Sequence, residues 1–285
     1  MNIKIGLWPL SGNYGEAFSQ KYISEYVDKA VALGFKKFDN AESYGEETFQ
    51  KEICEVLCSK DAVSIDTKIR VNFDDEHWLK QLQYDLGRIY KKYGDKLGCI
   101  FLHNPRGDLK QVVLATETIV KYCKITGISS GVSLLKNDYQ NIKEFPVDVL
   151  QVDLNPTFCS EISKIISAVK PDKIEARSLF GSGLLIANIN NLTPEDQRRR
   201  WSTPARLNAG AFFKKQALTH IKNEDDLTLA LIKFPALWAI KNVVLGSTNY
   251  ERLKLWKRAS ETTETPNDIQ FATVLKKIGQ GLYCF

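Results

Sequence analysis

Three features of the 285-residue sequence predict an α/β fold built as a single closed (β/α)8 barrel, the TIM barrel. Eight short apolar segments alternate with longer stretches of helical periodicity, as parallel strands joined by helices do. No G-x-G-x-x-G motif follows the first apolar segment, which argues against an open doubly wound sheet. Three consecutive predicted strands end in ionisable side chains, as expected where a barrel carries its active site at one rim.

The predicted strands and helices follow one another along the chain. Strands are expected at Ile3–Trp8, Lys36–Asn40, Val63–Lys68, Cys99–Leu102, Gly127–Ser133, Val149–Asp153, Ile174–Ser178 and Val243–Leu245. Helices are expected at Ser19–Leu33, Thr48–Ser59, Asp75–Tyr93, Leu109–Cys123 and Ser160–Val169. In the third helix, apolar residues recur every three or four positions, which is the spacing of one helix face.

The interval after the seventh strand, residues 180–224, is longer than an ordinary connection in a compact domain. Thr193 and Pro194 predict a short helix within it, with Thr193 as its N-cap. The run Arg198-Arg199-Arg200 is either a solvated helix end or a clamp for an anionic group. A helix is also expected near the C-terminus. With it, residues 1–285 form one predicted barrel domain.

Composition excludes several classes of protein. A hydrophobic content of 44% supplies a full core, which argues against disorder. No apolar run reaches the roughly 18 residues of a membrane span, and a net charge of +5 is mild for a nucleic-acid-binding protein. The six cysteines form no CxxC pair and have no histidine at metal-ligand spacing. We expect a cytoplasmic protein with free thiols and no metal, nucleic-acid or membrane partner, present as a monomer or weak homo-oligomer.

The predicted active site gathers four side chains at the carboxyl ends of the second, third and fourth strands. Asp39 follows Phe38, Lys68 and His103 end the next two strands, and Tyr44 lies in the loop after Asp39. Neighbouring strands lie roughly 4.8 Å apart, so these groups converge at one rim. Singly, each residue is explained as well by capping, packing or a structural hydrogen bond. Their joint occurrence at three successive strand ends favours a catalytic site.

These four groups suit the reduction of a carbonyl by hydride transfer, because negative charge develops on the carbonyl oxygen. Tyr44 is the best-suited proton donor, although an ordinary phenol has a pKa of about 10. The Lys68 ammonium stabilises a phenolate, Asp39 holds Lys68 in place, and His103 orients the carbonyl. We expect the hydride to come from a nicotinamide, since no metal or flavin motif is visible.

Seven motifs occur along the chain in a fixed order. They are Phe38-Asp39-Asn40-Ala41-Glu42-Ser43-Tyr44-Gly45, Thr67-Lys68, Leu102-His103-Asn104-Pro105, Gly131-Val132-Ser133, Gln151-Val152-Asp153-Leu154-Asn155-Pro156, Gly181-Ser182-Gly183-Leu184-Leu185 and Val243-Val244-Leu245-Gly246-Ser247-Thr248. In this order the sequence resembles the aldo-keto reductase superfamily, in its bacterial type, over about residues 3–260. The resemblance implies an NAD(P)H-dependent carbonyl reductase with catalytic residues Asp39, Tyr44, Lys68 and His103.

The resemblance also implies a set of cofactor-binding residues. Ser133 and Gln151 match the residues that hold the nicotinamide carboxamide, and Arg177 stands where many members stack a tyrosine on the ring. The loop that approaches the phosphates is matched by Ser178, Gly181, Gly183 and Leu184. The segment that grips the adenosine 2′-phosphate is matched by Ser247, Thr248 and Arg252, while Gly246 occupies a cofactor-binding place that is often held by lysine. This set favours NADP(H), with NAD(H) as the alternative.

The pocket for a small carbonyl or sugar-like substrate is expected at the same rim, lined by Trp8, Leu134 and Phe158. Each of the three is explained equally well by ordinary packing. Three alternative functions stay open. They are an NAD(P)-dependent aldose or alcohol dehydrogenase working in the oxidative direction, a nicotinamide-binding sensor with little turnover, and an isomerase or lyase barrel with the same layout.

A last expectation concerns the barrel interior beneath the catalytic groups. Side chains alternate along a strand, so residues two apart share a face. If Asp39 and Lys68 point inward, then Lys37 and Asp66 point inward one layer below them. We therefore expect a buried Lys37–Asp66 ion pair, the alternative being that a twist sends Lys37 to solvent.

Overall fold

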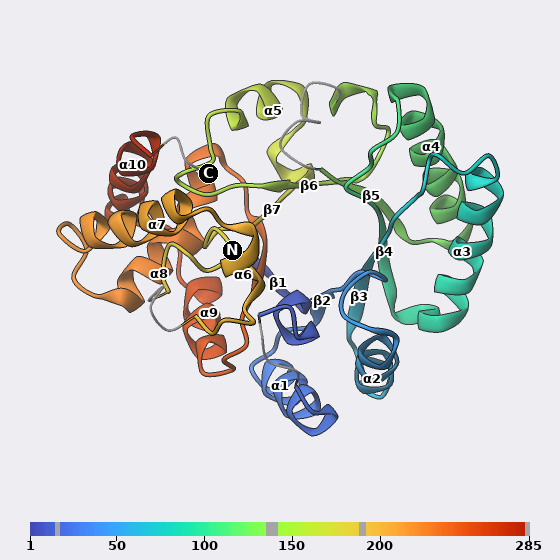
Figure 1. Ribbon diagram of the computed structural model, residues 1–285, viewed down its shortest axis with the longest axis horizontal. Helices are drawn as coiled ribbons and strands as arrows, with labels where there is room; N and C mark the ends of the chain where they lie inside the picture. The colour runs from blue at the N-terminus through green and yellow to red at the C-terminus, as the bar shows by residue number, and fades with distance from the viewer. Residues whose placement is uncertain (15–17, 135–141, 188–191, 283–285) are drawn as a thin grey trace.

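The computed structural model describes residues 1–14, 18–134, 142–187 and 192–282, with only the backbone at 200 and 201. Eight parallel strands, hydrogen-bonded in chain order, close into a barrel (Figure 1). They are β1 (Asn2–Gly6), β2 (Lys37–Asp39), β3 (Ser64–Ile69), β4 (Leu97–His103), β5 (Ser129–Ser133), β6 (Val149–Asp153), β7 (Ile174–Arg177) and β8 (Asn242–Gly246). The pairing of β8 with β1 closes the sheet. The predicted (β/α)8 barrel is confirmed.

Helices form the outer ring around these strands (Figure 1). They are α1 (Gln20–Ala32), α2 (Glu47–Cys58), α3 (Trp78–Tyr93), α4 (Leu109–Thr126), α5 (Ile162–Ala168), α6 (Gln197–Trp201), α7 (Pro204–Ala217), α8 (Glu224–Lys233), α9 (Arg252–Glu261) and α10 (Pro266–Gln280). The last of these is the predicted C-terminal helix. Among the described residues, no helix combines the length and the apolar character needed to cross a bilayer.

The main core lies between the barrel and this ring. Ile65, Ile100 and Val132 on the strands are fully buried, as are Ile53 and Ile119 on the helices. They belong to one continuous hydrophobic cluster. Because strand side chains alternate, the residues between these apolar positions point into the barrel, and several of them are charged. The fold therefore brings charged side chains into the interior below the rim.

The long segment after β7 contains two helices, α6 and α7. The predicted helix start at Thr193 is wrong, because Thr193 opens a turn in which its carbonyl accepts the N–H of Asp196 at 3.2 Å. The helix α6 begins at Gln197 instead, with Asp196 as its N-cap. The Asp196 carboxylate accepts the backbone N–H of Arg198 at 2.9 Å, which satisfies a helix-end donor.

The predicted Lys37–Asp66 ion pair is also wrong, because the strand register differs from the expected one. Asp39 pairs in register with Asp66, and Lys37 with Ser64, so Asp66 lies level with Asp39 and not below it. Lys37 is exposed at the start of its strand. The cation beside Asp66 comes from β1 instead, where the Lys4 ammonium forms an ion pair with the Asp66 carboxylate.

Candidate active site

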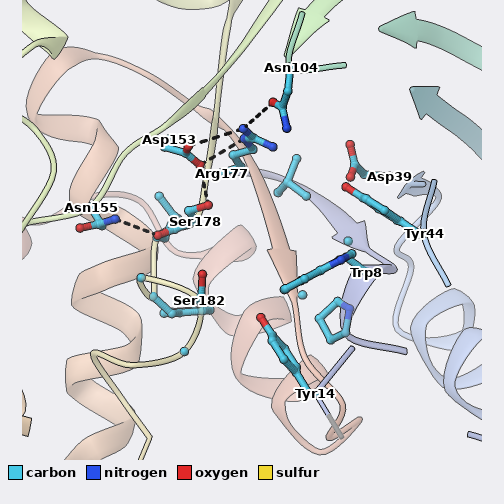
Figure 2. Close-up of a pocket in the computed structure, with 18 of the residues that line it drawn as sticks. Trp8, Tyr14, Asp39, Tyr44, Asn104, Asp153, Asn155, Arg177, Ser178 and Ser182 are labelled. Atoms are coloured by element: carbon cyan, nitrogen blue, oxygen red, sulfur yellow. Dashed lines mark hydrogen bonds and ion pairs between the residues drawn. The ribbon is translucent and has the colours of Figure 1, made fainter. Parts of the chain in front are cut away.

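A cavity of about 530 Å³ opens at the carboxyl ends of the strands. Residues that end or follow seven of the eight strands line it, and only β5 contributes none among the described residues. Figure 2 shows Trp8, Tyr44 and Arg177 around this space. The rim predicted from the three ionisable strand ends is therefore the rim at which the structure has its cavity.

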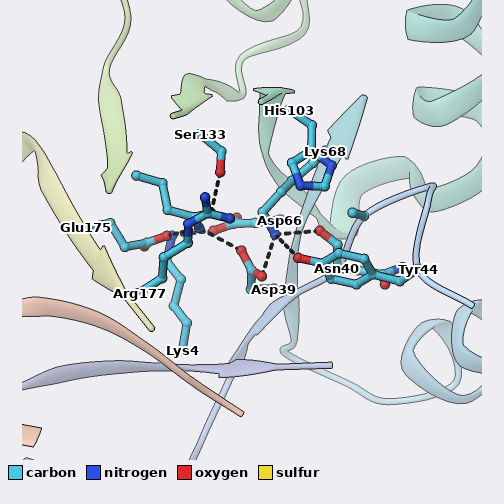
Figure 3. A network of polar contacts seen from close by, with 12 residues as sticks. Lys4, Asp39, Asn40, Tyr44, Asp66, Lys68, His103, Ser133, Glu175 and Arg177 are labelled. Carbon is cyan, nitrogen blue, oxygen red and sulfur yellow. Dashed lines mark hydrogen bonds and ion pairs between the residues drawn. The ribbon is translucent and has the colours of Figure 1, made fainter. Parts of the chain in front are cut away.

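Asp39, Tyr44 and His103 line the cavity floor, and Lys68 lies buried beneath them (Figure 3). The Lys68 ammonium donates to the Asp39 carboxylate at 2.5 Å and to the Tyr44 hydroxyl at 3.1 Å. It also donates to the carbonyl of Asn40 at 2.9 Å, so three acceptors fix its position. The rings of Tyr44 and His103 lie edge to face with centroids 6.0 Å apart. A phenol and an imidazole therefore border the same part of the cavity.

A tight turn after β2 places Tyr44. The Tyr44 N–H donates to the carbonyl of Ala41 at 3.0 Å, and the Gln50 side chain donates to the carbonyls of Ala41 and Tyr44 at 3.0 and 2.5 Å. Gly45 continues the chain at a φ of +62°, a left-handed conformation that favours glycine. The Tyr-Gly pair thus brings the phenol back over the barrel mouth.

The charges at the floor are set by burial and by their neighbours. Burial by itself lowers the pKa of Lys68, but the Asp39 carboxylate and Tyr44 more than offset this and raise it, so the ammonium stays charged. Burial also lowers the pKa of His103, to about 2, and the cations of Lys68, Arg177 and Arg70 add to this shift. His103 is consequently a neutral imidazole at physiological pH.

Ser133 and Gln151 lie below the floor and are fully buried. The Ser133 hydroxyl donates to the Gln151 side chain at 2.8 Å, and the Gln151 amide nitrogen donates to Asp39 at 2.9 Å and to Glu175 at 2.8 Å. This chain of hydrogen bonds joins the candidate catalytic carboxylate to the barrel interior.

The lower end of this series of hydrogen bonds is Glu175, which contacts Lys4 (Figure 3). The Lys4 ammonium pairs with Glu175 at 2.5 Å as well as with Asp66. Burial raises the pKa values of both carboxyl groups, and the Lys4 charge opposes that shift. One lysine therefore compensates two buried acids directly beneath the floor.

The loop after β7 supplies a concave stretch of backbone to the cavity. Ser178, Gly181, Ser182 and Gly183 have φ values of +59°, +54°, +59° and +86°, all in the left-handed region. Successive backbone N–H groups in turn conformations form concavities that bind anions. All four residues line the cavity, whereas Leu184 is buried behind them.

Arg177 lies beside this loop and is held by several acceptors. Its guanidinium pairs with Asp153 at 3.2 Å and donates to the Asn104 side chain at 3.2 Å and to the carbonyl of Leu134 at 3.1 Å. The Ser178 hydroxyl donates to the same Asp153 carboxylate at 2.6 Å (Figure 2). Arg177 is thus fixed in one orientation at the cavity wall.

The segment after β8 leads into α9. Gly246 lines the cavity, and the Ser247 hydroxyl accepts the N–H of Asn249 at 3.0 Å. The carbonyl of Thr248 accepts the Tyr22 hydroxyl at 2.6 Å, and Arg252 is the first residue of α9. Burial lowers the pKa of Arg252. These residues form a helix N-terminus next to the cavity.

The residues predicted to line the substrate pocket fall into two groups. Trp8 and Phe158 line the cavity, whereas Leu134 is fully buried and lies outside the lining. Of the arginine run, Arg198 pairs with Asp196 at 2.5 Å. The Arg198 guanidinium also lies 4.2 Å from the Tyr14 ring, beside the cavity.

Comparison with known proteins places the chain in a family. The sequence profile of the aldo/keto reductase family matches residues 2–274. The chain belongs to the aldo/keto reductase family. Members of this family are oxidoreductases that use a nicotinamide cofactor on small carbonyl substrates. Among curated protein sequences, none matches this aldo/keto reductase.

Solved structures of aldo/keto reductases share its fold. The aldo-keto reductase AKR11C1 from Bacillus halodurans, in its holo form, is 15% identical with a TM-score of 0.71, over 96% of this chain and 91% of that one. The glycerol dehydrogenase AKR11B4 from Gluconobacter oxydans is 14% identical with a TM-score of 0.70, over 96% and 90%. An aldo/keto reductase from Brucella melitensis is 20% identical with a TM-score of 0.64, over 96% and 92%.

Several residues of this aldo/keto reductase that the structure brings to the site were not predicted from the sequence. Tyr14, Arg70 and Arg206 line the cavity, and Lys4 and Glu175 lie beneath its floor. Strand alternation points to three of them. Arg70 is two residues beyond Lys68, Lys4 is the single charge of β1, and Glu175 is two residues before Arg177 in β7. Tyr14 and Arg206 lie outside the strands, where no such periodicity applies.

The neutral state of His103 predicts how stability depends on pH. Its folded-state pKa of about 2 lies below the ordinary value of 6.5, so the unfolded chain binds the extra proton. Unfolding then becomes easier as the pH falls below about 6.5, at up to about 1.4 kcal/mol per pH unit for this group. Urea unfolding between pH 7 and about pH 5 should show this slope in the wild type and a shallower one in His103→Gln. Identical slopes in the two proteins would contradict the assignment.

Proposed function

We propose that this aldo/keto reductase reduces an aldehyde or ketone to an alcohol, with hydride from NADPH and a proton from Tyr44. One observation carries the proposal. The Lys68 ammonium lies 3.1 Å from the Tyr44 hydroxyl and 2.5 Å from Asp39, at the floor of an open cavity. When bound, NADPH supplies the hydride that adds to the carbonyl carbon.

In this reaction the Tyr44 hydroxyl donates its proton to the carbonyl oxygen as negative charge develops there. Lys68 stabilises the phenolate that remains, and Asp39 keeps the ammonium beneath the hydroxyl. Neutral His103 orients the carbonyl by donating a hydrogen bond from its ring. This role needs no change in its charge, which agrees with the lowered pKa of its imidazole.

The residues around the cavity suit a dinucleotide cofactor. The left-handed residues between Ser178 and Gly183 provide an anion-binding concavity for its phosphates. Arg177 at the end of β7 and Arg206 on α7 line the wall on the same side. Ser133 and Gln151, which match the residues that hold the nicotinamide carboxamide, are fully buried outside the cavity lining and support Asp39 from beneath by hydrogen bonds. Leu184 supports this loop from behind.

The experiment that tests the function follows the absorbance of NADPH with a panel of aldehydes, ketones and sugars. We expect consumption of NADPH with at least one small carbonyl compound and formation of the matching alcohol. The absence of turnover with every carbonyl, in protein shown to bind NADPH, would overturn the proposal. It would favour a nicotinamide-binding sensor in its place.

Preference for NADPH over NADH is assigned to Ser247, Thr248 and Arg252, at the start of α9. The positive end of a helix and a guanidinium both favour the 2′-phosphate, which NADH lacks. A charged hydrogen bond is worth about 1.5–3 kcal/mol, so Arg252→Ala should weaken NADPH binding by about tenfold or more. Binding of NADH should change little. Fluorescence titration with each nucleotide measures both dissociation constants.

The exposed Arg258 on the same helix provides the matched control. Arg258→Ala removes the same charge and should leave both dissociation constants close to those of the wild type. If Arg252→Ala weakened the binding of NADPH and of NADH equally, this arginine would not be the residue that binds the 2′-phosphate.

Oxidation of an alcohol by NADP is a second candidate direction at this site. Lys68 stabilises the phenolate form of Tyr44, and a phenolate is the form that accepts a proton from an alcohol. We also propose a single domain over residues 1–285 in the cytoplasm, as a monomer or weak homo-oligomer. The free thiols of Cys54, Cys58, Cys99, Cys123 and Cys159 suit a reducing compartment.

A further inference from the structure

We propose that the carbonyl substrate of this enzyme carries an oxyanion, a carboxylate or a phosphate, and that Arg70 binds it. The inference rests on the proposed carbonyl reduction and names the chemical class of its substrate. Three observations support it: the place of Arg70 in the barrel, its charge environment, and the distance around the barrel from the phosphate-binding loop.

Arg70 directly follows β3 and lines the cavity. It stands two residues beyond Lys68, so strand alternation gives the two side chains the same inward side. In the barrel, β3 lies between β2 and β4, and the residues that follow or end those strands include Tyr44 and His103. Arg70 therefore belongs to the same part of the rim as the phenol and the imidazole proposed to hold the carbonyl.

The charge of Arg70 acts on this site. After burial and Lys68, the cations of Arg177 and Arg70 contribute to lowering the pKa of His103. Both aspartates of the lining are engaged by other cations, Asp39 by Lys68 and Asp153 by Arg177. Within the described ranges 1–14, 18–134, 142–187 and 192–282, no carboxylate forms an ion pair with Arg70. An exposed cation at the cavity rim is thus available to an anionic ligand.

Arg70 also stands on the side of the cavity away from the loop assigned to the cofactor phosphates. In a closed barrel of eight strands, β3 and β7 are four strands apart and lie on opposite sides. The loop Ser178–Gly183 follows β7, and Gly246 ends β8, whereas Arg70 follows β3. A dinucleotide whose phosphates lie at β7 leaves the β3 side of the cavity to the substrate.

The chemistry of the side chain defines the ligand. A guanidinium presents paired N–H donors that match the two oxygens of a carboxylate or a phosphate. A substrate whose carbonyl oxygen meets Tyr44 and His103 would extend its anionic group to Arg70 over the short distance along this rim. Carbonyl compounds with an acidic group a few bonds from the carbonyl fit this arrangement, whereas neutral ones leave the guanidinium unused.

The test compares matched substrates that differ in charge. One pair is 4-carboxybenzaldehyde and the isosteric 4-carbamoylbenzaldehyde, and the other is glyceraldehyde 3-phosphate and glyceraldehyde. In the wild type, kcat/KM should be about tenfold or more higher for an anionic member than for its neutral partner. The pair with the larger ratio identifies the carboxylate or the phosphate as the natural group.

Variants of Arg70 test whether this residue causes the preference for anionic substrates. Arg70→Gln should lower kcat/KM for the anionic substrate far more than for its neutral partner, and Arg70→Lys should keep part of the preference. Arg106 is exposed, follows His103 by three residues and lies outside the lining. Arg106→Gln therefore removes the same charge nearby and should leave the wild-type ratio unchanged.

Failure of this inference differs from failure of the proposed function. Turnover of both members of each pair at equal kcat/KM, or an equal loss for both in Arg70→Gln, would overturn the role of Arg70 while carbonyl reduction stands. If no substrate is turned over, the proposed carbonyl reduction is wrong, and the role of Arg70 is tested by ligand binding instead. In that case 4-carboxybenzyl alcohol should still quench tryptophan fluorescence at lower concentration than 4-carbamoylbenzyl alcohol, and Arg70→Gln should remove the difference; equal binding of the two alcohols would overturn the inference.

Discussion

Replacing Tyr44 by phenylalanine is expected to lower kcat for carbonyl reduction by about 10²–10⁴-fold, the usual contribution of a general acid. The substitution removes only the hydroxyl that Lys68 contacts at 3.1 Å and keeps the ring that packs against His103. Binding of NADPH should therefore persist. Steady-state kinetics with the best carbonyl substrate, together with a fluorescence titration of NADPH, measures both effects.

A surface tyrosine provides the control for this prediction. Tyr84 is 68% exposed on α3, far along the chain from the site, and Tyr84→Phe should keep the wild-type kcat. If Tyr44→Phe also kept the wild-type kcat, the proton would have to come from another donor, and the role given to Lys68 would fall with that of Tyr44.

The second large effect is expected beneath the floor, where Lys4 pairs with Asp66 and Glu175. Lys4→Met would leave two carboxyl groups, which are 4% and 1% exposed, without their cation. Removing one partner of a buried ion pair costs about 3–5 kcal/mol, because the remaining charge is poorly solvated. The free energy of unfolding, measured with urea at about pH 7, should fall by this amount.

Two comparisons make this prediction specific. Lys254→Met breaks the exposed ion pair between Lys254 and Glu251, whose side chains are 72% and 59% exposed, and should cost far less stability because water already solvates both charges. Adding Glu175→Gln to Lys4→Met should recover part of the loss, because one uncompensated charge disappears. A loss in Lys4→Met no greater than that in Lys254→Met would show that the buried pair contributes little.

The sign of the pH dependence follows from the two carboxyl groups. Burial holds the pKa values of Asp66 and Glu175 above their ordinary values, so the folded chain binds more protons than the unfolded chain. Stability from these groups therefore falls as the pH rises through their folded-state pKa values. Without Lys4 this pH dependence is larger. The loss in free energy of unfolding caused by Lys4→Met should therefore be greatest near about pH 8 and smaller toward about pH 5.

The barrel was predictable from the sequence because its signals are local. Ser19, where the predicted helix begins, accepts the N–H of Tyr22 as the N-cap of α1, and the predicted strand Val149–Asp153 is the observed β6. The convergence of Asp39, Lys68 and His103 follows from parallel strands that end at one rim. The fold and the residues at the cavity floor were therefore predictable from periodicity, helix caps and strand ends, which are each visible within one segment of the sequence.

The parts that could not be predicted depend on pairing between segments. The register of β2 against β3 places Asp39 level with Asp66, and neither segment alone encodes that offset. Lys4 on β1 pairs across the barrel interior with Asp66 on β3 and Glu175 on β7, two strands that are distant from it in the sequence. Likewise, the start of α6 depended on which of two polar residues, Thr193 or Asp196, accepted the first helical N–H.

Isotope labelling follows the hydride itself from cofactor to product. The wild-type enzyme is given NADPH deuterated at both C4 positions and 4-carboxybenzaldehyde, and the alcohol is analysed by mass spectrometry. We predict one deuterium on the carbinol carbon in the wild type, and at least about a hundredfold less labelled alcohol in the same time with Tyr44→Phe. Alcohol without deuterium, or equal labelling by both proteins, would contradict hydride transfer at a site where Tyr44 is the acid.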